Sequence, residues 1–273
     1  DLHRVDRRQR QMCIRDRVYD AGPLYASGEE AGSRVVAPFL HAQGLRQLHS
    51  LIVTHDDNDH SGGALGLVAS HRPAALLTSL AGVDTATLSP HGQALLAAVP
   101  AARACLAGDA WSWDGIEFRV LHPPAHHYRN RNYKDNERSC VLKVTGPGGS
   151  ILLTADIERL GELSLLERRA DDLRADVLLA PHHGSRSSSM PEFLDAVAPR
   201  TVVIPVGHRN RYGHPAAEVL ARYRARGMQV LRTDRDGAVA LRFTARGVET
   251  SRARHTQRRY WHRVFPDREA APG

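Results

Sequence analysis

The sequence has no long hydrophobic run. Nowhere do about 18 or more apolar residues follow one another, which a membrane-spanning helix would require. The first residues are charged rather than apolar, so we expect no signal peptide there. Hydrophobic residues nevertheless make up 42% of the 273 residues, enough for a sizeable core. This length suits one large α/β domain better than two small ones.

Cysteine is scarce as well. The chain has three, Cys13, Cys105 and Cys140, an odd number without the spacing of a metal site. We therefore expect no disulfide framework. Cys105 and Cys140 lie in apolar stretches and are interpreted as small core residues.

The middle of the chain lacks the positive charge that the whole chain carries. The formal net charge is +7, but six arginines against three aspartates lie in residues 1–17, and eight arginines against three acids lie in residues 242–273. Basic ends of this kind can bind phosphate backbones or anionic lipid. Solvated, disordered ends are an equally common explanation, so charge alone does not choose between them.

One short stretch carries four potential metal ligands within six residues, in the pattern His55-x-Asp57-x-Asp59-His60. The apolar run 51–53 precedes it and predicts a strand, and two glycines and a helix-like segment follow. Imidazole nitrogen and carboxylate oxygen together suit Zn²⁺, Mn²⁺ or Fe²⁺. A polar surface loop is the simpler alternative in a chain with 16 histidines. The combination of spacing, strand and glycines favours a metal site.

Two further predicted strands end in residues of the same type. The first ends at Asp156, and the second ends at His182 and His183. Asp156 alone could be a helix N-cap, a role that Asp fills well, and it could serve as both. The chain as a whole reads as strands followed by strands and then as alternating β and α units. This order favours two mixed sheets packed face to face, with helices outside.

The metal-ligand stretch resembles the signature of the metallo-β-lactamase superfamily, His-x-[His/Asp]-x-Asp-His. With Asp57, His182-His183-Gly184-Ser185 and the segment 210–215, it is similar to the C-terminal hydrolase domain of ComEC-type DNA-uptake competence proteins. The resemblance covers roughly residues 18 to 262. It implies an α/β (α+β) fold, the αββα sandwich of that superfamily.

The resemblance also implies a ligand set and a division of the chain. His55 and Asp57 would bind one divalent metal, Asp59 and His60 a second, and Asp156 would bridge them. One of His182 and His183 would complete the second site, and we favour His182. The expected metals are Mn²⁺ or Zn²⁺, with carboxylates favouring Mn²⁺. The hydrolase domain is expected at 18–245, followed by a basic tail at 246–273, and residues 1–17 as a non-native or disordered segment.

The chain departs from the wider superfamily at the first metal. Asp57 replaces the usual histidine, and there is no clear third-motif histidine. His122 is one candidate, although the His122-Pro123 pair could equally end a strand. Asn136 lies where that ligand is often found, and the ComEC-like pattern Asn-x-x-Ser also includes Ser139. Asp20, in a strand-end Asp-x-Gly, is interpreted as a hydrogen-bonding residue behind the metal rather than a ligand.

Substrate and catalytic roles follow from the same resemblance. Asp59 could orient the attacking water as well as bind metal, and His214 could protonate the leaving oxygen. A histidine that merely precedes Pro215 at a helix start is an equal alternative. The residues expected to contact substrate are Asn136, Ser139, His183, Ser185 and Asn210.

These features predict a metal-dependent phosphodiesterase that acts on DNA during uptake, with DNA and a parent membrane channel domain as partners. The basic loop residues Arg129, Arg131, Lys134 and Arg138 support a polyanionic substrate, and Tyr133 could stack on a base. A lactonase or thioesterase on the same fold is one alternative. A non-catalytic module that grips DNA is another. We expect a soluble fragment of an inner-membrane protein, facing the periplasm.

Overall fold

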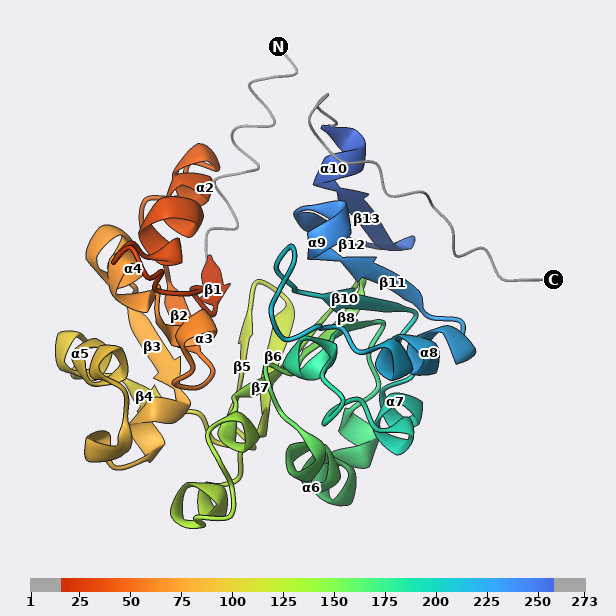
Figure 1. Cartoon of the computed structure of the whole chain (residues 1–273), viewed down its shortest axis with the longest axis horizontal. Coiled ribbons are helices and arrows are strands. Elements are labelled where there is room, and N and C mark those ends of the chain that lie inside the picture. The colour runs from red at the N-terminus through yellow and green to blue at the C-terminus, as the bar shows by residue number, and fades with distance from the viewer. Residues whose placement is uncertain (1–15, 258–273) are drawn as a thin grey trace.

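The computed structural model describes residues 16–257 as two sheets that face each other, with helices on both outer sides (Figure 1). The first sheet has the order β1-β2-β3-β4 and is wholly parallel. Its strands are β1 (Arg17–Tyr19), β2 (Ser50–Val53), β3 (Ala75–Thr78) and β4 (Arg103–Ala104). We expected two mixed sheets, and for this sheet that prediction is wrong, because a helical crossover separates each pair of neighbouring strands.

The second sheet is mixed, with the order β11-β10-β9-β8-β7-β6-β5. Its first four strands in the chain form an antiparallel meander, and parallel pairing begins where β9 joins β8. The strands are β5 (Ala110–Trp113), β6 (Ile116–His122), β7 (Val141–Gly146), β8 (Gly149–Leu153), β9 (Val177–Leu179), β10 (Thr201–Ile204) and β11 (Gln229–Arg232).

Helices cover the outer face of each sheet (Figure 1). The first sheet is covered by a π-helical turn η1 (Gly32–Val36) that continues into α2 (Ala37–Ala42), by α4 (Ala64–His71) and by α5 (Pro90–Ala98). The second is covered by α6 (Arg159–Arg169), α7 (Pro191–Val197) and α8 (Ala217–Ala225). Short helices are α3 (Asn58–Ser61), α9 (Thr233–Asp236) and α10 (Ala253–Thr256), and the 3₁₀ turns are η2 (Ser79–Gly82), η3 (Thr85–Thr87), η4 (Ala125–Arg129), η5 (Asn136–Arg138), η6 (Ala170–Asp172) and η7 (Pro181–Gly184).

Strand β2 shows why the sandwich forms. Leu51 and Val53 pack against the outer helices, while Ile52, which points the other way, packs between the sheets with Phe118 and Leu142. Side chains alternate across a strand, so a strand that is apolar at every position must be covered on both faces. The two sheets therefore lie between two layers of helices. This is the αββα arrangement expected from the sequence.

The sequence correctly placed Cys105 and Cys140 in the core, but the expectation that they form no disulfide was wrong. Cys105, just after β4, and Cys140, just before β7, form a disulfide with their Cα atoms 5.8 Å apart. Both are fully buried in the core between the sheets. They are 35 residues apart in sequence, and only the packing of one sheet on the other brings them together.

The domain extends beyond the expected boundaries at both its N-terminal and its C-terminal side. Arg17, assigned to the N-terminal segment, begins β1, and its guanidinium lies over the rings of Trp113 and Phe118. Strand β12 (Val239–Thr244) pairs with β13 (Gly247–Arg252), so a hairpin spans the boundary at 245. Its apolar residues pack with Val203 of β10. Residues 1–15 and 258–273, which hold most of both basic ends, lie outside the described range.

No helix in the described range 16–257 is long and apolar enough to cross a membrane, as the sequence predicts.

Candidate metal centre

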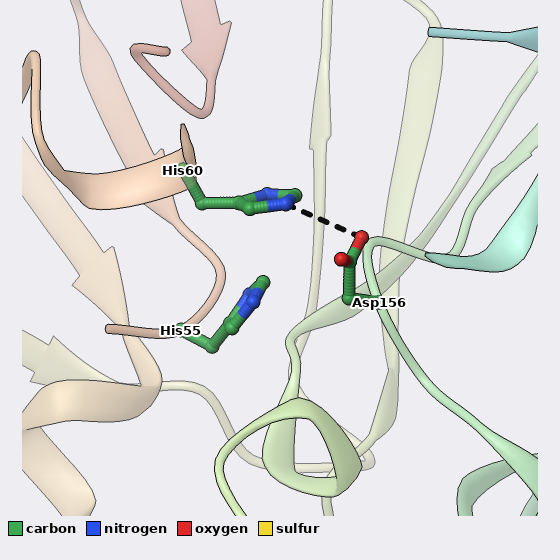
Figure 2. A group of neighbouring side chains, drawn as sticks. All are labelled: His55, His60 and Asp156. Carbon is green, nitrogen blue, oxygen red and sulfur yellow. Dashed lines mark ion pairs between the residues drawn. The ribbon is translucent and has the colours of Figure 1, made fainter. Parts of the chain in front are cut away.

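Strand ends from both sheets meet at one edge of the sandwich. The loop after β2 carries His55 and His60, and the loop after β8 carries Asp156. Figure 2 shows the two imidazoles approaching the carboxylate from the opposite side, with His60 Nε2 3.2 Å from Asp156 Oδ1. Strand β2 belongs to the first sheet and β8 to the second, so the packing of one sheet on the other brings together residues so distant in sequence.

The glycines after the histidine stretch allow the loop to pack closely. A Cβ on Gly63 would overlap the carbonyl oxygen of Ala21, and one on Gly62 would overlap the backbone nitrogen of Leu24. Gly63 N also donates to the carbonyl of Gly22. The paired glycines therefore let the segment that follows α3 lie against the turn after β1. This turn carries Asp20.

The hydrogen bonds of His55 determine which of its nitrogens faces the site. Its Nδ1 lies 2.9 Å from the hydroxyl oxygen of Thr54, and that hydroxyl donates its only proton to Asp20 Oδ2. The hydroxyl can therefore only accept from His55, so Nδ1 carries the proton. His55 Nε2 is left with a free lone pair, as a metal ligand requires.

His60 is oriented in the same way. Its Nδ1 lies 2.8 Å from Asp20 Oδ2, and a carboxylate oxygen can only accept, so Nδ1 is protonated and Nε2 faces Asp156. Asp20 also accepts from the backbone nitrogen of Thr54 at 2.8 Å, which fixes the carboxylate. This is the supporting role that the sequence predicts for Asp20.

The two histidines after β9 differ in their suitability as ligands. His183 Nδ1 lies 2.7 Å from the carbonyl oxygen of Pro205, and its Nε2 lies 3.2 Å from Asp59 Oδ2 and 3.4 Å from Asp156 Oδ2. His182 Nε2 is 3.7 Å from Asp156, and its Nδ1 is 3.0 Å from Glu158. Both have left-handed backbone angles in the tight turn before Gly184. The geometry favours His183, whereas the sequence favoured His182.

Asp59 and Asp156 are held in their ionised form. The neighbouring imidazole of His183 lowers the pKa of Asp59 to about 2. Burial acts to raise the pKa of Asp156, but His60 and His183 outweigh burial and lower it. Asp156 is only 5% exposed, whereas the Asp57 and Asp59 side chains are 53% and 54% exposed. The centre is therefore closed at Asp156 and open to substrate beside Asp57 and Asp59.

One carboxylate at the centre was missed in the sequence. Asp135, in the loop between β6 and β7, lies with His55 and Asp57 so that one ligand atom of each is within 4.8 Å of the others. Its Oδ2 accepts from the backbone nitrogen of Asp56 at 2.6 Å. The sequence signal was its place directly before Asn136, in the segment where a third ligand was expected.

The donor set fits divalent metal ions. Among residues 16–257, three overlapping groups have ligand atoms within 4.8 Å of one another. They are His55, His60 and Asp156; Asp59, His60 and His183; and His55, Asp57 and Asp135. The Nε2 atoms of His55 and His60 are buried and make no hydrogen bond to this part of the chain. Buried polar atoms without a hydrogen bond are costly, so a bound cation would suit this cluster.

The sequence also named His122 and Asn136 as candidates for the first metal. His122 is fully buried, and its Nε2 lies 2.9 Å from the carbonyl oxygen of Glu137, while burial lowers its pKa to about 3. It belongs to none of the ligand groups found in residues 16–257. Asn136 is half-buried in η5 beside Asp135, and Ser139 is fully buried with a hydroxyl that has no hydrogen-bond partner there.

The remaining expected substrate residues lie on loops beside the centre. Ser185 follows the His182-His183 turn, and its hydroxyl lies 3.0 Å from that of Ser187. The side chain of Asn210 is occupied by the backbone of His214, whose nitrogen and carbonyl it binds at 2.9 and 2.7 Å. The His214 ring lies 5.8 Å from that of His182. Asn210 therefore shapes the loop that presents His214.

The family model of the metallo-β-lactamase superfamily matches residues 18–208, more than half of the chain. The chain belongs to the metallo-β-lactamase superfamily. Its fold is the metallo-β-lactamase fold, as the sequence predicts, and a protein of this superfamily with such a donor set is expected to bind divalent metal.

The chain is similar over most of its length to several curated proteins. The chain is 35% identical over 247 residues to Competence protein ComA of Neisseria gonorrhoeae, covering 88% of this chain and 32% of that protein. It is 34% identical over 215 residues to ComE operon protein 3 of Bacillus subtilis, covering 79% and 27%. Recombination protein 2 of Haemophilus influenzae is 30% identical over 248 residues, covering 91% and 29%. The chain spans about a third of the length of these relatives.

Solved metallo-β-lactamase structures are more distant. CmlA, a diiron β-hydroxylase from Streptomyces venezuelae, gives a TM-score of 0.44 at 15% identity over 76% of this chain and 45% of that one. A metallo-β-lactamase from Cronobacter sakazakii gives 0.42 at 14% identity over 67% and 79%.

Proposed function

We propose that this domain is a metal-dependent phosphodiesterase that cuts DNA during uptake. The observation that carries the proposal is the cluster of His55, His60 and His183, whose Nε2 atoms lie beside ionised carboxylates. His55 Nε2 is 3.6 Å from Asp57 Oδ2, His60 Nε2 is 3.2 Å from Asp156 Oδ1, and His183 Nε2 is 3.2 Å from Asp59 Oδ2. The superfamily supports a metal-dependent hydrolase, and the similarity to competence proteins supports DNA as the substrate.

Two divalent metals suit the arrangement of donors. His55, Asp57 and Asp135 would hold one, and Asp59, His60 and His183 the other, with Asp156 between them. Such a pair of metals would polarise a phosphoryl oxygen and lower the pKa of a bound water. The carboxylate-rich first site favours Mn²⁺ over Zn²⁺. Relative to the sequence prediction, Asp135 is added to the first site and His183 takes the place of His182.

The chain's own residues would do the remaining work. The half-exposed Asp59 would orient the attacking water, as well as bind metal. His214 would contact the leaving oxygen; burial and the nearby His182 and His183 lower its pKa, so at neutral pH it would act as a neutral N–H donor. Ser185 follows the turn that carries His183, and its hydroxyl would contact the phosphate.

The disulfide supports an oxidising working compartment for the domain. Disulfides such as Cys105–Cys140 form and persist in oxidising compartments and are rare in the cytosol. This supports a parent protein of the inner membrane whose hydrolase domain faces the periplasm, beside a DNA channel.

Metal analysis and a nuclease assay on the same preparation test the proposed function. The domain should bind about two divalent ions and cut single-stranded DNA with Mn²⁺ or Zn²⁺, and EDTA should stop the reaction. Lactone and thioester substrates are the matched comparison for the small-substrate hydrolases. Hydrolysis of these substrates without cleavage of DNA would overturn the proposal. DNA binding without any hydrolysis would support a non-catalytic DNA-gripping module instead.

A further inference from the structure

The ring of Tyr212 is conspicuously open to solvent. It is 67% exposed, more than any other exposed large hydrophobic residue in the described range 16–257. Such a ring is costly to leave in water unless something packs on it. Tyr133, the aromatic residue that the sequence suggested for base stacking, instead packs on His127 with ring centres 3.5 Å apart.

Tyr212 lies at the rim of the metal centre. It belongs to the loop between β10 and α8, and its ring is stacked on His214 with centres 5.9 Å apart and planes 17° apart. His214 in turn lies 5.8 Å from the ring of His182, whose Nε2 is 3.7 Å from Asp156 Oδ2. A continuous series of rings therefore joins an exposed aromatic face to the carboxylate at the centre.

The loop holds this ring in place before any ligand binds. Asn210 binds both the nitrogen and the carbonyl of His214, which closes the loop, and Gly213 supplies a left-handed turn with φ of 69°. Arg211 donates a hydrogen bond of 2.7 Å to the Tyr212 hydroxyl, and its guanidinium carbon is 4.9 Å from the ring centre. A ring that is already positioned loses little entropy on binding.

The surroundings of Tyr212 suit a flat ligand that carries negative charge. His208, Arg209 and Arg211 are exposed on the same loop, and His214 already covers one ring face. A nucleotide combines a flat base with an anionic phosphate, and stacking of bases on aromatic side chains tolerates any sequence. A simple lactone does not offer this combination.

We propose that Tyr212 stacks on a nucleobase next to the phosphodiester that is cut, and so places the strand in the metal centre. The inference rests on the proposed function for the identity of the polymer. It makes Tyr212 a residue that binds substrate, and it assigns to Asn210 and Arg211 the role of holding that ring.

The test compares strands with and without bases. We expect Tyr212→Ala to raise KM for a single-stranded oligonucleotide about tenfold, because one stacked base is lost. KM for a strand of the same length built only from abasic nucleotides should stay unchanged, and Tyr212→Trp should retain wild-type KM. Phe39→Ala, which removes an exposed ring on the outer helix α2, is the matched control and should change neither value.

A second readout does not depend on cleavage. In EDTA, an oligonucleotide that contains 2-aminopurine should lose fluorescence on binding the wild-type chain, and Tyr212→Ala should remove most of that quenching. If the wild-type chain binds with quenching but cuts nothing, the stacking proposal stands and the proposed nuclease function fails. The stacking proposal is overturned if Tyr212→Ala matches the wild type in KM and quenching. An equal loss of turnover on natural and abasic strands would overturn it too, since Tyr212 would then only support His214.

Discussion

At the scale of single residues, the hydrogen-bond partners of the histidines determine which imidazole nitrogen can bind a metal. Thr54, Asp20 and the carbonyl of Pro205 each bind an Nδ1 atom, which leaves Nε2 of His55, His60 and His183 directed at the carboxylates. Such outer partners fix the tautomer and orientation of a metal-binding histidine. An array of correctly oriented lone pairs therefore exists before a metal arrives.

Asp59→Asn and Asp156→Asn should each reduce hydrolysis by more than about 100-fold, since loss of a ligand exceeds the about 10–100-fold effect of losing an outer partner. The amide keeps the volume and removes the charge, so circular dichroism and the unfolding midpoint without metal should stay close to wild type. Cleavage at the wild-type rate by either variant would exclude the role assigned to that residue. Global unfolding would instead indicate a structural metal.

His183→Gln and His182→Gln form a matched pair. We expect His183→Gln to lose one of two bound metal ions and nearly all activity, because His183 Nε2 lies within 3.4 Å of both Asp59 Oδ2 and Asp156 Oδ2. His182→Gln should keep its full metal content, measured by elemental analysis after dialysis. The reverse result would restore the original choice of His182 as the ligand.

At the scale of elements, the disulfide joins the two sheets beside the metal centre. Cys105 follows β4 of the first sheet, and Cys140 precedes β7 of the second. The backbone nitrogen of Cys140 also donates to the carbonyl of Thr54, the residue that orients His55. The covalent link therefore lies one hydrogen bond away from the metal-binding loop.

Loss of this disulfide should destabilise the domain. A link that closes a loop of 35 residues typically contributes about 2–4 kcal/mol, by restricting the unfolded chain. We expect the Cys105→Ala/Cys140→Ala variant to unfold at a lower urea concentration and with a steeper slope, because its unfolded chain is less compact. Dithiothreitol should shift the wild type but not the variant. If dithiothreitol has no effect on wild type, the two thiols are not linked in solution.

At the scale of the whole molecule, the centre is shared between the two halves of the sandwich. The first sheet supplies His55, Asp57, Asp59 and His60, while Asp135, Asp156 and His183 come from loops of the second. Ions held between them would link the halves. Folding and metal binding are then coupled, because an unfolded chain has no assembled site.

Divalent metal should accordingly raise the thermal stability of the whole domain. At a free metal concentration of 100 times Kd, binding adds about 2.7 kcal/mol, so the unfolding midpoint should rise by several degrees. EDTA should reverse the shift, and Asp156→Asn should nearly abolish it. A midpoint that is insensitive to Mn²⁺ and Zn²⁺ in calorimetry would contradict a shared metal centre.

DNA affinity should fall steeply as salt rises. Arg129, Arg131 and Lys134 are exposed on the loop that carries Asp135, whereas Arg138 is used within the loop, since its guanidinium donates to the carbonyls of His127 and Asn130. Replacing the three exposed residues by Ala should reduce the slope of log Kd against log salt by about 2, at about 0.7 per phosphate contact.

The matched control for this loop uses the opposite end of the strands. Arg72, Arg174 and Arg200 are exposed and lead into β3, β9 and β10, away from the edge that carries the metal centre. Their replacement removes equal charge and should leave the slope unchanged. If both triple variants behave alike, DNA contacts are spread over the surface and the loop has no special role.

Local sequence pattern was sufficient to predict much of the metal-binding loop and the layering of sheets and helices. The metal-ligand pattern at residues 55–60 depends only on neighbouring positions in the chain. It can be recognised in the sequence because a tight turn directs neighbouring side chains to the same place. The apolar run 51–53 likewise indicated a strand, and the order of the predicted strands and helices favoured two packed sheets. The resemblance to the superfamily then identified this layering as the αββα fold.

Tertiary structure decided what depends on long-range packing. Cys105 and Cys140 pair only because one sheet lies on the other, and no spacing in the sequence signals that contact. The choice between His182 and His183 depends on which ring reaches the carbonyl of Pro205, contributed by the neighbouring strand. Asp135 joins the centre through a hydrogen bond to a residue 79 positions away. Sequence thus determined which kinds of ligand are present, and three-dimensional packing determined which individual atoms meet.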